Sequence, residues 1–295
     1  MNRKSLHACP APAKLNLFLH VIGRRADGYH LLQSVFQLID RGDTLHFDLR
    51  DDGRIHRTND VPGVPEESDL IVRALARLAE AFQLRHGRAA PGIDVAVEKI
   101  LPMGGGLGGG SSDAATALMA ANALWQAGFT DAELMAIGLP LGADIPFFIY
   151  GQTAFVEGVG EAMQPVDGPD CWYVVIEPGV SVPTPAIFTA EDLTRDSKPV
   201  RIADFPAAHL LNEFGRNDLQ AVASRLFPPV AQAIEWLGQY GAARMTGSGA
   251  CVFCAVPNAA EADLVLGQVP GNWRAWKARS LQQHPLKSLL QNNEL

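Results

Sequence analysis

Residues 101–115 read LPMGGGLGGGSSDAA, and this stretch decides the fold. Glycine occupies six of the seven positions from Gly104 to Gly110. Glycine lets a backbone adopt positive φ angles and approach a ligand closely. Free N–H groups in such a loop, with the positive end of a helix that follows, bind anions. We therefore predict that this loop binds a nucleoside triphosphate. The loop consists of Pro102, Met103, Gly104, Gly105, Gly106, Leu107, Gly108, Gly109, Gly110, Ser111 and Ser112.

Three other interpretations of the run compete with this one. A flexible surface linker is the simplest, but linkers rarely lie between an alternating strand and a strong helix. Residues 104–109 match the dinucleotide fingerprint Gly-x-Gly-x-x-Gly, yet that motif opens a unit whose second strand ends in an acidic residue, and no such order follows here. A Walker A loop needs a lysine after its last glycine, and Ser111 stands there. The loop is thus expected to bind phosphate through another architecture.

The segments around the loop predict a mixed architecture. Residues 93–97 alternate in polarity as a strand does, and residues 111–125 are rich in alanine and leucine, which favours a helix. Alternation also predicts strands at 14–21 and at 43–49, the second after a turn at Arg41-Gly42. Helical spacing predicts a helix over 69–84, with Ser68 near its N-cap. Strands, a helix, and a strand that leads through a loop into a helix indicate an α+β fold.

The second half repeats these signals less clearly. Strands are expected at 172–176 and 250–256, and helices at 217–238 and 259–267. The proline-rich segment 178–185 should be an extended connector, because proline removes a backbone donor and restricts the residue before it. The polar stretch 280–295 is expected to fray. A chain of 295 residues favours two domains, which we place at 1–160 and 161–295.

Composition excludes several classes of protein. A hydrophobic content of 47% and a charged content of 19% are ordinary for a soluble globular chain, and the net charge of -8 argues against nucleic-acid or anionic-membrane binding. No apolar stretch approaches the roughly 20 residues that a membrane helix needs, and the first residues do not read as a signal peptide. With four cysteines in so long a chain, a reducing, cytoplasmic location is expected.

Cys251 and Cys254 form a C-x-x-C pair, which is typical of metal or redox sites. The pair lies in an apolar run that predicts a buried strand, and residues three apart on a strand point to opposite faces. We therefore expect both cysteines to pack in the core, without a shared metal ion or disulfide bond.

Two further residues are candidates for catalysis. Asp144 is the acid in the apolar octet 141–148 (LGADIPFF), where desolvation would suit a carboxylate to accept a proton; an N-cap followed by Pro146 explains it equally well. Lys14 leads into an apolar strand, and taken alone it is better explained as a strand-edge lysine that guards against aggregation.

Four motifs in this order resemble the GHMP kinase superfamily: residues 12–40 (PAKLNLFLHVIGRRADGYHLLQSVFQLID), 101–115, 141–148 and 244–253 (RMTGSGACVF). Within it, RADGYH (25–30), AFVEGVGE (154–161) and PGVSVPTPAIF (178–188) are similar to the members whose substrate carries a cytidine diphosphate. The resemblance covers nearly the whole chain and weakens over 198–218 and after residue 271. Its strength lies in the order of the motifs, since no single one is specific.

The resemblance implies an N-terminal domain like that of ribosomal protein S5, a ferredoxin-like C-terminal domain, and an active site between them. It implies transfer of the γ-phosphoryl group of ATP to the 2-hydroxyl of 4-diphosphocytidyl-2-C-methyl-D-erythritol, a step of the non-mevalonate isoprenoid pathway. Asp144 would accept the hydroxyl proton, and Lys14 would keep that carboxylate ionised and offset charge on the transferred group, which agrees with the needs of phosphoryl transfer.

The resemblance also assigns binding residues. Tyr29 and Phe188 would enclose the cytosine, and His30 would read its polar edge; core packing is the plainer explanation for such aromatic residues. The same pocket would hold Asn16 and Thr184, while Lys99 and Asp69 would contact adenine and ribose. Asp69 departs from the asparagine expected there. Residues 247–249 would form a glycine turn that supports the phosphate loop and substrate.

Mg²⁺ is expected with ATP, with Ser112 as a candidate ligand. Two other functions compete: a GHMP kinase for a smaller alcohol such as mevalonate or homoserine, and a nucleotide-binding regulator that has lost catalysis. RADGYH and PTPAIF argue against the first, and intact Lys14 and Asp144 against the second. The expected partner is a small molecule, not nucleic acid or a membrane, and the protein is expected to be a monomer or homodimer.

Overall fold

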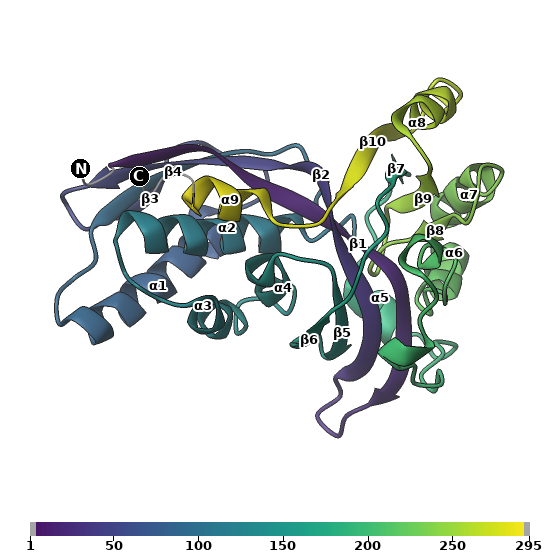
Figure 1. Cartoon of the computed structure of the whole chain (residues 1–295), viewed down its shortest axis with the longest axis horizontal. Helices are drawn as coiled ribbons and strands as arrows, with labels where there is room; N and C mark the ends of the chain where they lie inside the picture. The colour runs from purple at the N-terminus through teal and green to yellow at the C-terminus, as the bar shows by residue number, and fades with distance from the viewer. Residues whose placement is uncertain (1–3, 292–295) are drawn as a thin grey trace.

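Two long antiparallel strands form the spine of the molecule (Figure 1). The computed structural model describes residues 4–291. Within it, β1 (Ser5–Arg24) pairs with β2 (His30–Arg50) along almost its whole length, from Ser5 opposite Asp48 to Arg24 opposite His30. One end of this ribbon lies among the first helices and the other reaches the C-terminal half, so that residues from both halves meet beside it.

The remaining strands extend the sheet in the order β3-β4-β2-β10-β7-β9-β8, with β5 added to β2 and β6 to β5. They are β3 (Ile55–Arg57), β4 (Gly92–Glu98), β5 (Ala154–Gly158), β6 (Ala162–Pro165), β7 (Trp172–Glu177), β8 (Arg244–Met245), β9 (Val252–Val256) and β10 (Arg274–Leu281). A short antiparallel contact of β10 with β2, at Ser280 opposite Ile39, connects the sheet of the second half to that of the first.

The α-helices described are α1 (Leu70–His86), α2 (Gly109–Leu124), α3 (Asp131–Gly138), α4 (Ile145–Tyr150), α5 (Thr184–Phe188), α6 (Gln220–Leu226), α7 (Pro228–Leu237), α8 (Ala259–Leu266) and α9 (Pro285–Gln291). Helices α1 to α4 cover the N-terminal part of the sheet, whereas α6 to α8 pack in the C-terminal half (Figure 1). Helix α2 is apolar on nearly all sides because α1, α4 and the sheet surround it. None of the helices in residues 4–291 is long and apolar enough to cross a membrane.

The α+β architecture and the predicted helix after the glycine run are confirmed, but the turn at Arg41-Gly42 is wrong. Strand β2 continues through Gly42, which lies opposite Pro12 next to an irregularity in the β1–β2 pairing. A Cβ on Gly42 would come within 2.3 Å of the carbonyl oxygen of Ala11. This glycine therefore serves a close approach of two strands rather than a turn.

Two predictions for the second half also need correction. The helix expected over 217–238 is divided into α6 and α7 at Phe227, because Pro228 lacks the N–H that a continuous helix requires. The fraying expected over 280–295 is wrong for α9, which packs against α2 and buries Leu286; residues 292–295 lie outside the described part. The predicted domain limits at 160 and 161 stay a prediction, and α9 returns the chain to the first half.

The C-x-x-C pair has the structural role predicted for it. Cys251 and Cys254 are both fully buried, and they belong to two different apolar clusters. Burial raises the pKa of both thiols, to about 11 for Cys254. Within residues 4–291 no group of His, Cys, Asp and Glu side chains is arranged to hold a metal ion by itself.

Candidate active site

The glycine run forms a loop that only glycine can follow at several points. Gly104, Gly106 and Gly108 have φ angles of 67°, 74° and 73°, in the left-handed region that other residues rarely adopt. Gly108 is the N-cap of α2, so the loop ends directly at the amino end of that helix. The loop thus leads into the positive end of a helix, a position that favours binding of an anion.

Contacts with the rest of the protein hold this loop rigidly. Its carbonyl groups accept hydrogen bonds at Gly105 from the N–H of Cys251 (3.1 Å) and at Leu107 from the N–H of Lys14 (3.0 Å). A Cβ on Gly106 would lie only 2.1 Å from the carbonyl oxygen of Thr246. The need for glycine at 106 therefore comes from packing on the segment 246–251. This agrees with the supporting role expected for Gly247 and its neighbours.

Two cavities lie on either side of the loop. The first, which we call the Lys14 cavity, measures about 380 Å³ and contains Lys14, Asp144 and Asn16 in its wall. The second, the Lys99 cavity, measures about 360 Å³ and is lined by Lys99, Asp69 and most of the loop. The two share one wall, which consists of Gly104, Gly106, Gly108 and Ser111. A ligand group held at this wall can be reached from both sides.

Lys14 and Asp144 face each other in the first cavity. The Nζ of Lys14 lies 3.6 Å from Oδ2 of Asp144 and donates to Oδ1 of Asn16 at 2.5 Å. The Lys14 side chain is 4% exposed, whereas that of Asp144 is 31% exposed. Burial lowers the pKa of Lys14, and the charge of Asp144 opposes this change. The carboxylate is less enclosed than its apolar sequence neighbours suggested, and it is open to a ligand.

The N-cap explanation offered for Asp144 is confirmed for its backbone, and its role as a proton acceptor stays a prediction. Asp144 is the N-cap residue of α4, with Pro146 in the first turn, as the structural interpretation required. However, its side chain makes no capping hydrogen bond and pairs with Lys14 instead. The N-cap position therefore fixes the backbone of Asp144, while its carboxylate faces Lys14 in the cavity.

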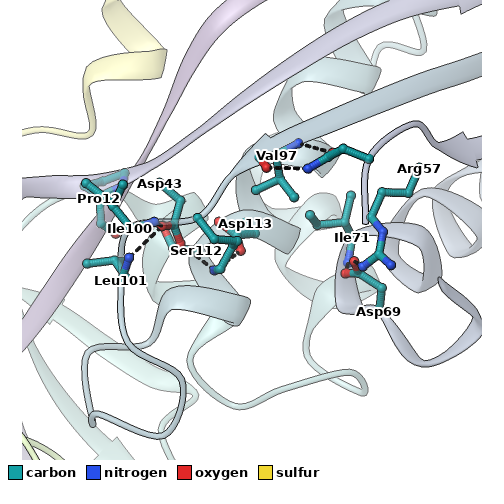
Figure 2. Close-up of polar contacts among 12 residues, drawn as sticks. Pro12, Asp43, Arg57, Asp69, Ile71, Val97, Ile100, Leu101, Ser112 and Asp113 are labelled. Atoms are coloured by element: carbon teal, nitrogen blue, oxygen red, sulfur yellow. Dashed lines mark hydrogen bonds and ion pairs between the residues drawn. The ribbon is translucent and has the colours of Figure 1, made fainter. Parts of the chain in front are cut away.

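The second lysine of the site has a different environment. Lys99 Nζ lies 2.5 Å from Oδ2 of Asp43 and 2.6 Å from Oδ2 of Asp113, and Oδ1 of Asp43 accepts from the backbone N–H groups of Ile100 and Leu101 (Figure 2). Burial opposes the charge on Lys99, but the two carboxylates outweigh it and raise its pKa. Burial raises the pKa of Asp113 to about 7, against the effect of Lys99.

Asp69 takes the N-cap position of α1 that was predicted for Ser68. Its Oδ1 accepts from the N–H of Ile71 at 2.8 Å, and its Oδ2 lies 2.6 Å from Nη1 of the buried Arg57 (Figure 2). An asparagine could cap the helix but could not neutralise Arg57. The departure from the family pattern thus has a structural explanation, although Asp69 still lines the Lys99 cavity.

The residues expected around cytosine are only partly assembled. Asn16, Thr184 and Phe188 line the Lys14 cavity, and the His30 ring lies 4.9 Å from that of Phe188. Tyr29 is 65% exposed at the end of the β1–β2 ribbon. The Tyr29–Phe188 enclosure of a base stays a prediction.

Ser112 does not suit the metal role considered for it. Its hydroxyl is fully buried and donates to the carbonyl oxygen of Pro12 at 2.7 Å, whereas Ser111 lines both cavities. Sequence reasoning also missed Asp43 and Asp113. Asp113 directly follows the two serines of the loop, which was a usable signal. Asp43 is far away in sequence, and only the pairing of β2 with β4 brings it to Lys99.

Comparisons with known proteins agree with this geometry. Residues 69–152 match the sequence model described as GHMP kinases N terminal domain, and residues 205–275 match GHMP kinases C terminal. A 4-diphosphocytidyl-2-C-methyl-D-erythritol kinase from Janthinobacterium sp. (strain Marseille) is 65% identical over 288 residues, 98% of this chain and 99% of that protein. One from Herminiimonas arsenicoxydans is 64% identical over 286 residues, 97% and 99% of the two chains.

Solved structures show the same fold. A crystal structure of 4-(cytidine 5'-diphospho)-2C-methyl-D-erythritol kinase superposes with a TM-score of 0.73 and 31% identity, covering 92% of this chain and 98% of that one. A homoserine kinase from Cytophaga hutchinsonii gives a TM-score of 0.68 at 17% identity, covering 96% and 97%, which is a likeness of fold alone. The chain therefore belongs to the GHMP kinase family and, within it, to the 4-diphosphocytidyl-2-C-methyl-D-erythritol kinases.

Proposed function

We propose that this kinase transfers the γ-phosphoryl group of ATP to the 2-hydroxyl of 4-diphosphocytidyl-2-C-methyl-D-erythritol in the non-mevalonate isoprenoid pathway. The observation that carries the proposal is the shared wall of the two cavities, Gly104, Gly106, Gly108 and Ser111. The Lys99 cavity would hold the nucleotide, the Lys14 cavity the alcohol, and the γ-phosphate would lie at the wall between them.

The Lys14 cavity contains the groups that such a transfer needs. Phosphoryl transfer depends mainly on positioning and on stabilising charge in the transition state. The partly exposed Asp144 carboxylate would accept the proton of the attacking hydroxyl. The Lys14 ammonium, 3.6 Å from that carboxylate, would pair with it and offset charge on the transferred group. Asn16 fixes the position of Lys14, because its Oδ1 accepts a hydrogen bond of 2.5 Å from the Nζ of Lys14.

The Lys99 cavity combines apolar and polar walls in the way that a nucleoside requires. Val61, Val64 and Met103 offer apolar surface for a base, while the loop offers backbone N–H groups for phosphates. Asp69 and Lys99 also line this cavity, as proposed contacts of adenine and ribose. Since Lys99 is already paired with Asp43 and Asp113, its contact with ATP would be made alongside those ion pairs.

Mg²⁺ is proposed as the companion of ATP, where it would offset phosphate charge. This ion usually keeps several waters and takes few protein ligands besides substrate phosphates. Within residues 4–291 no cluster could bind a metal by itself, so a protein ligand would act together with the phosphates of ATP. Ser111, which lines both cavities, is a side chain that could hold it. A cytoplasmic location and a monomer or homodimer remain part of the proposal.

The direct test incubates the purified protein with ATP, Mg²⁺ and the diphosphocytidyl alcohol and follows the product by ³¹P NMR. We expect one new phosphate monoester and stoichiometric ADP, with little ADP formed when the alcohol is omitted. Turnover of mevalonate or homoserine in place of this alcohol would assign the protein to a different GHMP activity. ATP binding without turnover of any alcohol would indicate a regulator.

Nucleobase binding has its own test. CDP should compete with the alcohol, and Tyr29→Ala should weaken binding of both by about 1–3 kcal/mol, the usual contribution of base–aromatic stacking. The KM for ATP should change little, because ATP would occupy the other cavity. If CDP does not compete in the wild type, the nucleobase pocket is absent and a smaller alcohol is the substrate.

A further inference from the structure

The segment that begins α9 contacts the far end of the helix that carries Asp144. Asp144 is the N-cap residue of α4, and Tyr150 is the last residue of that helix. The carbonyl oxygen of Tyr150 accepts a hydrogen bond from Nζ of Lys287 at 3.0 Å. The next carbonyl oxygen, that of Gly151, accepts one from the N–H of His284 at 2.7 Å. The end of α4 thus finds partners for two of its carbonyl groups outside the helix.

Close packing accompanies these hydrogen bonds. Gly151 has a φ angle of 75°, and a Cβ there would lie 2.9 Å from Cε of Lys287 and 3.0 Å from Cβ of His284. His284 is fully buried, and its Nδ1 accepts from the N–H of Leu286 at 3.2 Å. Leu286 in turn belongs to the same apolar cluster as the buried side chains of α4. The stem of Lys287 is therefore packed against the turn that ends α4.

Lys287 also brings a positive charge to this end of the helix. Its Nζ lies 2.6 Å from Oδ2 of Asp131 on α3, and its side chain is 17% exposed. Burial, together with the charge of Lys287, lowers the pKa of His284 to about 3, so the imidazole is neutral near pH 7. The last carbonyl groups of a helix carry partial negative charge and have no partner within it, so a lysine beside them is stabilising.

Helix α4 also packs on the glycine loop. A Cβ on Gly108 would lie 2.8 Å from Cζ of Phe148, so the loop and this helix are in close contact. With a rise of about 1.5 Å per residue, α4 spans about 9 Å from Ile145 to Tyr150. A displacement at the Lys287 end of so short a helix would therefore change the position of Asp144 relative to the loop.

We propose that Lys287 is a positioning residue for phosphoryl transfer: it holds the carboxyl end of α4 and thereby keeps the Asp144 carboxylate aligned with the hydroxyl that it deprotonates. This rests on the proposed function, in which Asp144 accepts that proton. A displacement of about 1 Å can cost up to about 10²-fold in rate, even when its cause lies far from the reacting atoms. Lys287 lines neither the Lys14 cavity nor the Lys99 cavity, so it would act through α4 without contact to either substrate.

Steady-state kinetics of Lys287→Met test the role in transfer. Methionine keeps most of the packed stem but removes the charge and the donor. We expect kcat to fall about tenfold, while the KM values for ATP and the alcohol stay within about twofold. Lys287→Arg keeps a charged donor and should restore most of kcat. The matched control is Lys277→Met, which removes a similar ion pair, 2.6 Å from Oδ2 of Asp263 in the other half of the chain, and should leave kcat unchanged.

Hydrogen–deuterium exchange tests the contact itself and needs no substrate. In Lys287→Met, backbone amides of residues 148–151 should exchange about two- to fivefold faster than in the wild type, the factor expected when a helix end loses one favourable cation. The same amides should be unchanged in Lys277→Met. Unchanged exchange in Lys287→Met would overturn the proposal even if kcat falls, because the lysine would then not act by holding α4.

A double variant separates positioning of Asp144 from a general loss of structure. In an Asp144→Asn background, Lys287→Met should change the residual kcat by less than about twofold, because the lysine acts through that carboxylate. A tenfold loss in that background as well, or a normal kcat in folded Lys287→Met, would overturn the proposal. Absence of turnover in the wild type would contradict the proposed function instead, and the exchange measurement would still decide whether Lys287 holds α4.

Discussion

Lys14 and Lys99 lie on opposite sides of the same glycine loop, and they are held very differently. Lys14 is buried beside a single, partly exposed carboxylate at 3.6 Å, and burial lowers its pKa. Lys99 lies between two buried carboxylates at 2.5 and 2.6 Å, which raise its pKa despite burial. The comparison indicates that the looser Lys14–Asp144 pair, which faces a cavity, is suited to phosphoryl transfer. The tightly paired Lys99 is suited to stabilising the glycine loop.

The support provided by Lys99 is local and specific. Oδ1 of Asp43 on β2 accepts hydrogen bonds from the N–H groups of Ile100 and Leu101, the two residues just before the loop. Asp113 lies in the first turns of α2, just after it. Lys99 thus connects both ends of the glycine run. A substitution in this cluster should therefore lower the stability of the fold more than it lowers the rate of phosphoryl transfer.

The largest effect on activity is expected for Asp144→Asn. This change keeps the shape of the side chain but removes the proton acceptor, so kcat should fall by roughly 10²-fold or more. ATP affinity, measured by calorimetry, should stay within about twofold, since the nucleotide would bind in the other cavity. Asp113→Asn is the matched control and should retain most of the turnover in a rapid-quench assay. A folded Asp144→Asn protein with near-normal turnover would make this residue structural.

Two glycines of the loop provide the next comparison. One is packed tightly against the backbone of another segment, and the other has room for a side chain. Gly106→Val would force a side chain into the carbonyl group of Thr246, and the free energy of unfolding should fall by about 2 kcal/mol or more. Gly110→Ala is the control. Gly110 lies inside α2, and a Cβ there would meet only the side chain of Leu70, at 3.5 Å. Chemical denaturation should show it unchanged or more stable. Equal stability of the two variants would contradict the packing described for Gly106.

A smaller effect should appear in the pH dependence of stability. The pKa of Asp113 is raised to about 7 in the folded state, from an ordinary value of 3.8. The folded state therefore holds this proton more strongly than the unfolded state does, and the contribution to stability is lost as the pH rises through about 7. Unfolding at pH 5, 6, 7 and 8 should show the wild type losing stability relative to Asp113→Asn. Parallel curves for the two proteins would contradict the shift.

The loop and the helix after it could be predicted from the sequence because their signals are local: glycines where φ is positive, then alanine and leucine at helical spacing. The break between α6 and α7 was also readable, in Pro228. The Lys99 cluster was not, because Asp43 lies 56 residues before Lys99 and only strand pairing brings the two together. Gly42 was misread as a turn because a glycine that permits a turn also permits two strands to approach closely.

The residues of the site also divide into those that could be predicted from the sequence and those whose role depends on the fold. Lys14 and Asp144 were identified as a pair through the resemblance, since nothing local connects positions so far apart. Asp69 was visible as a departure from asparagine, but its reason, the buried Arg57, depends on the fold.

The most direct test of the difference between the two lysines replaces each by methionine and measures kcat and the free energy of unfolding for both variants. Lys14→Met should lower kcat by roughly 10²-fold, with a change in stability of no more than about 1 kcal/mol, because Asp144 remains partly exposed to water. Lys99→Met leaves two buried carboxylates unpaired, so it should lose about 3–5 kcal/mol of stability, while the folded fraction keeps most of its kcat. The reverse pattern, with Lys14→Met unstable and Lys99→Met stable but inactive, would contradict the roles assigned to the two lysines.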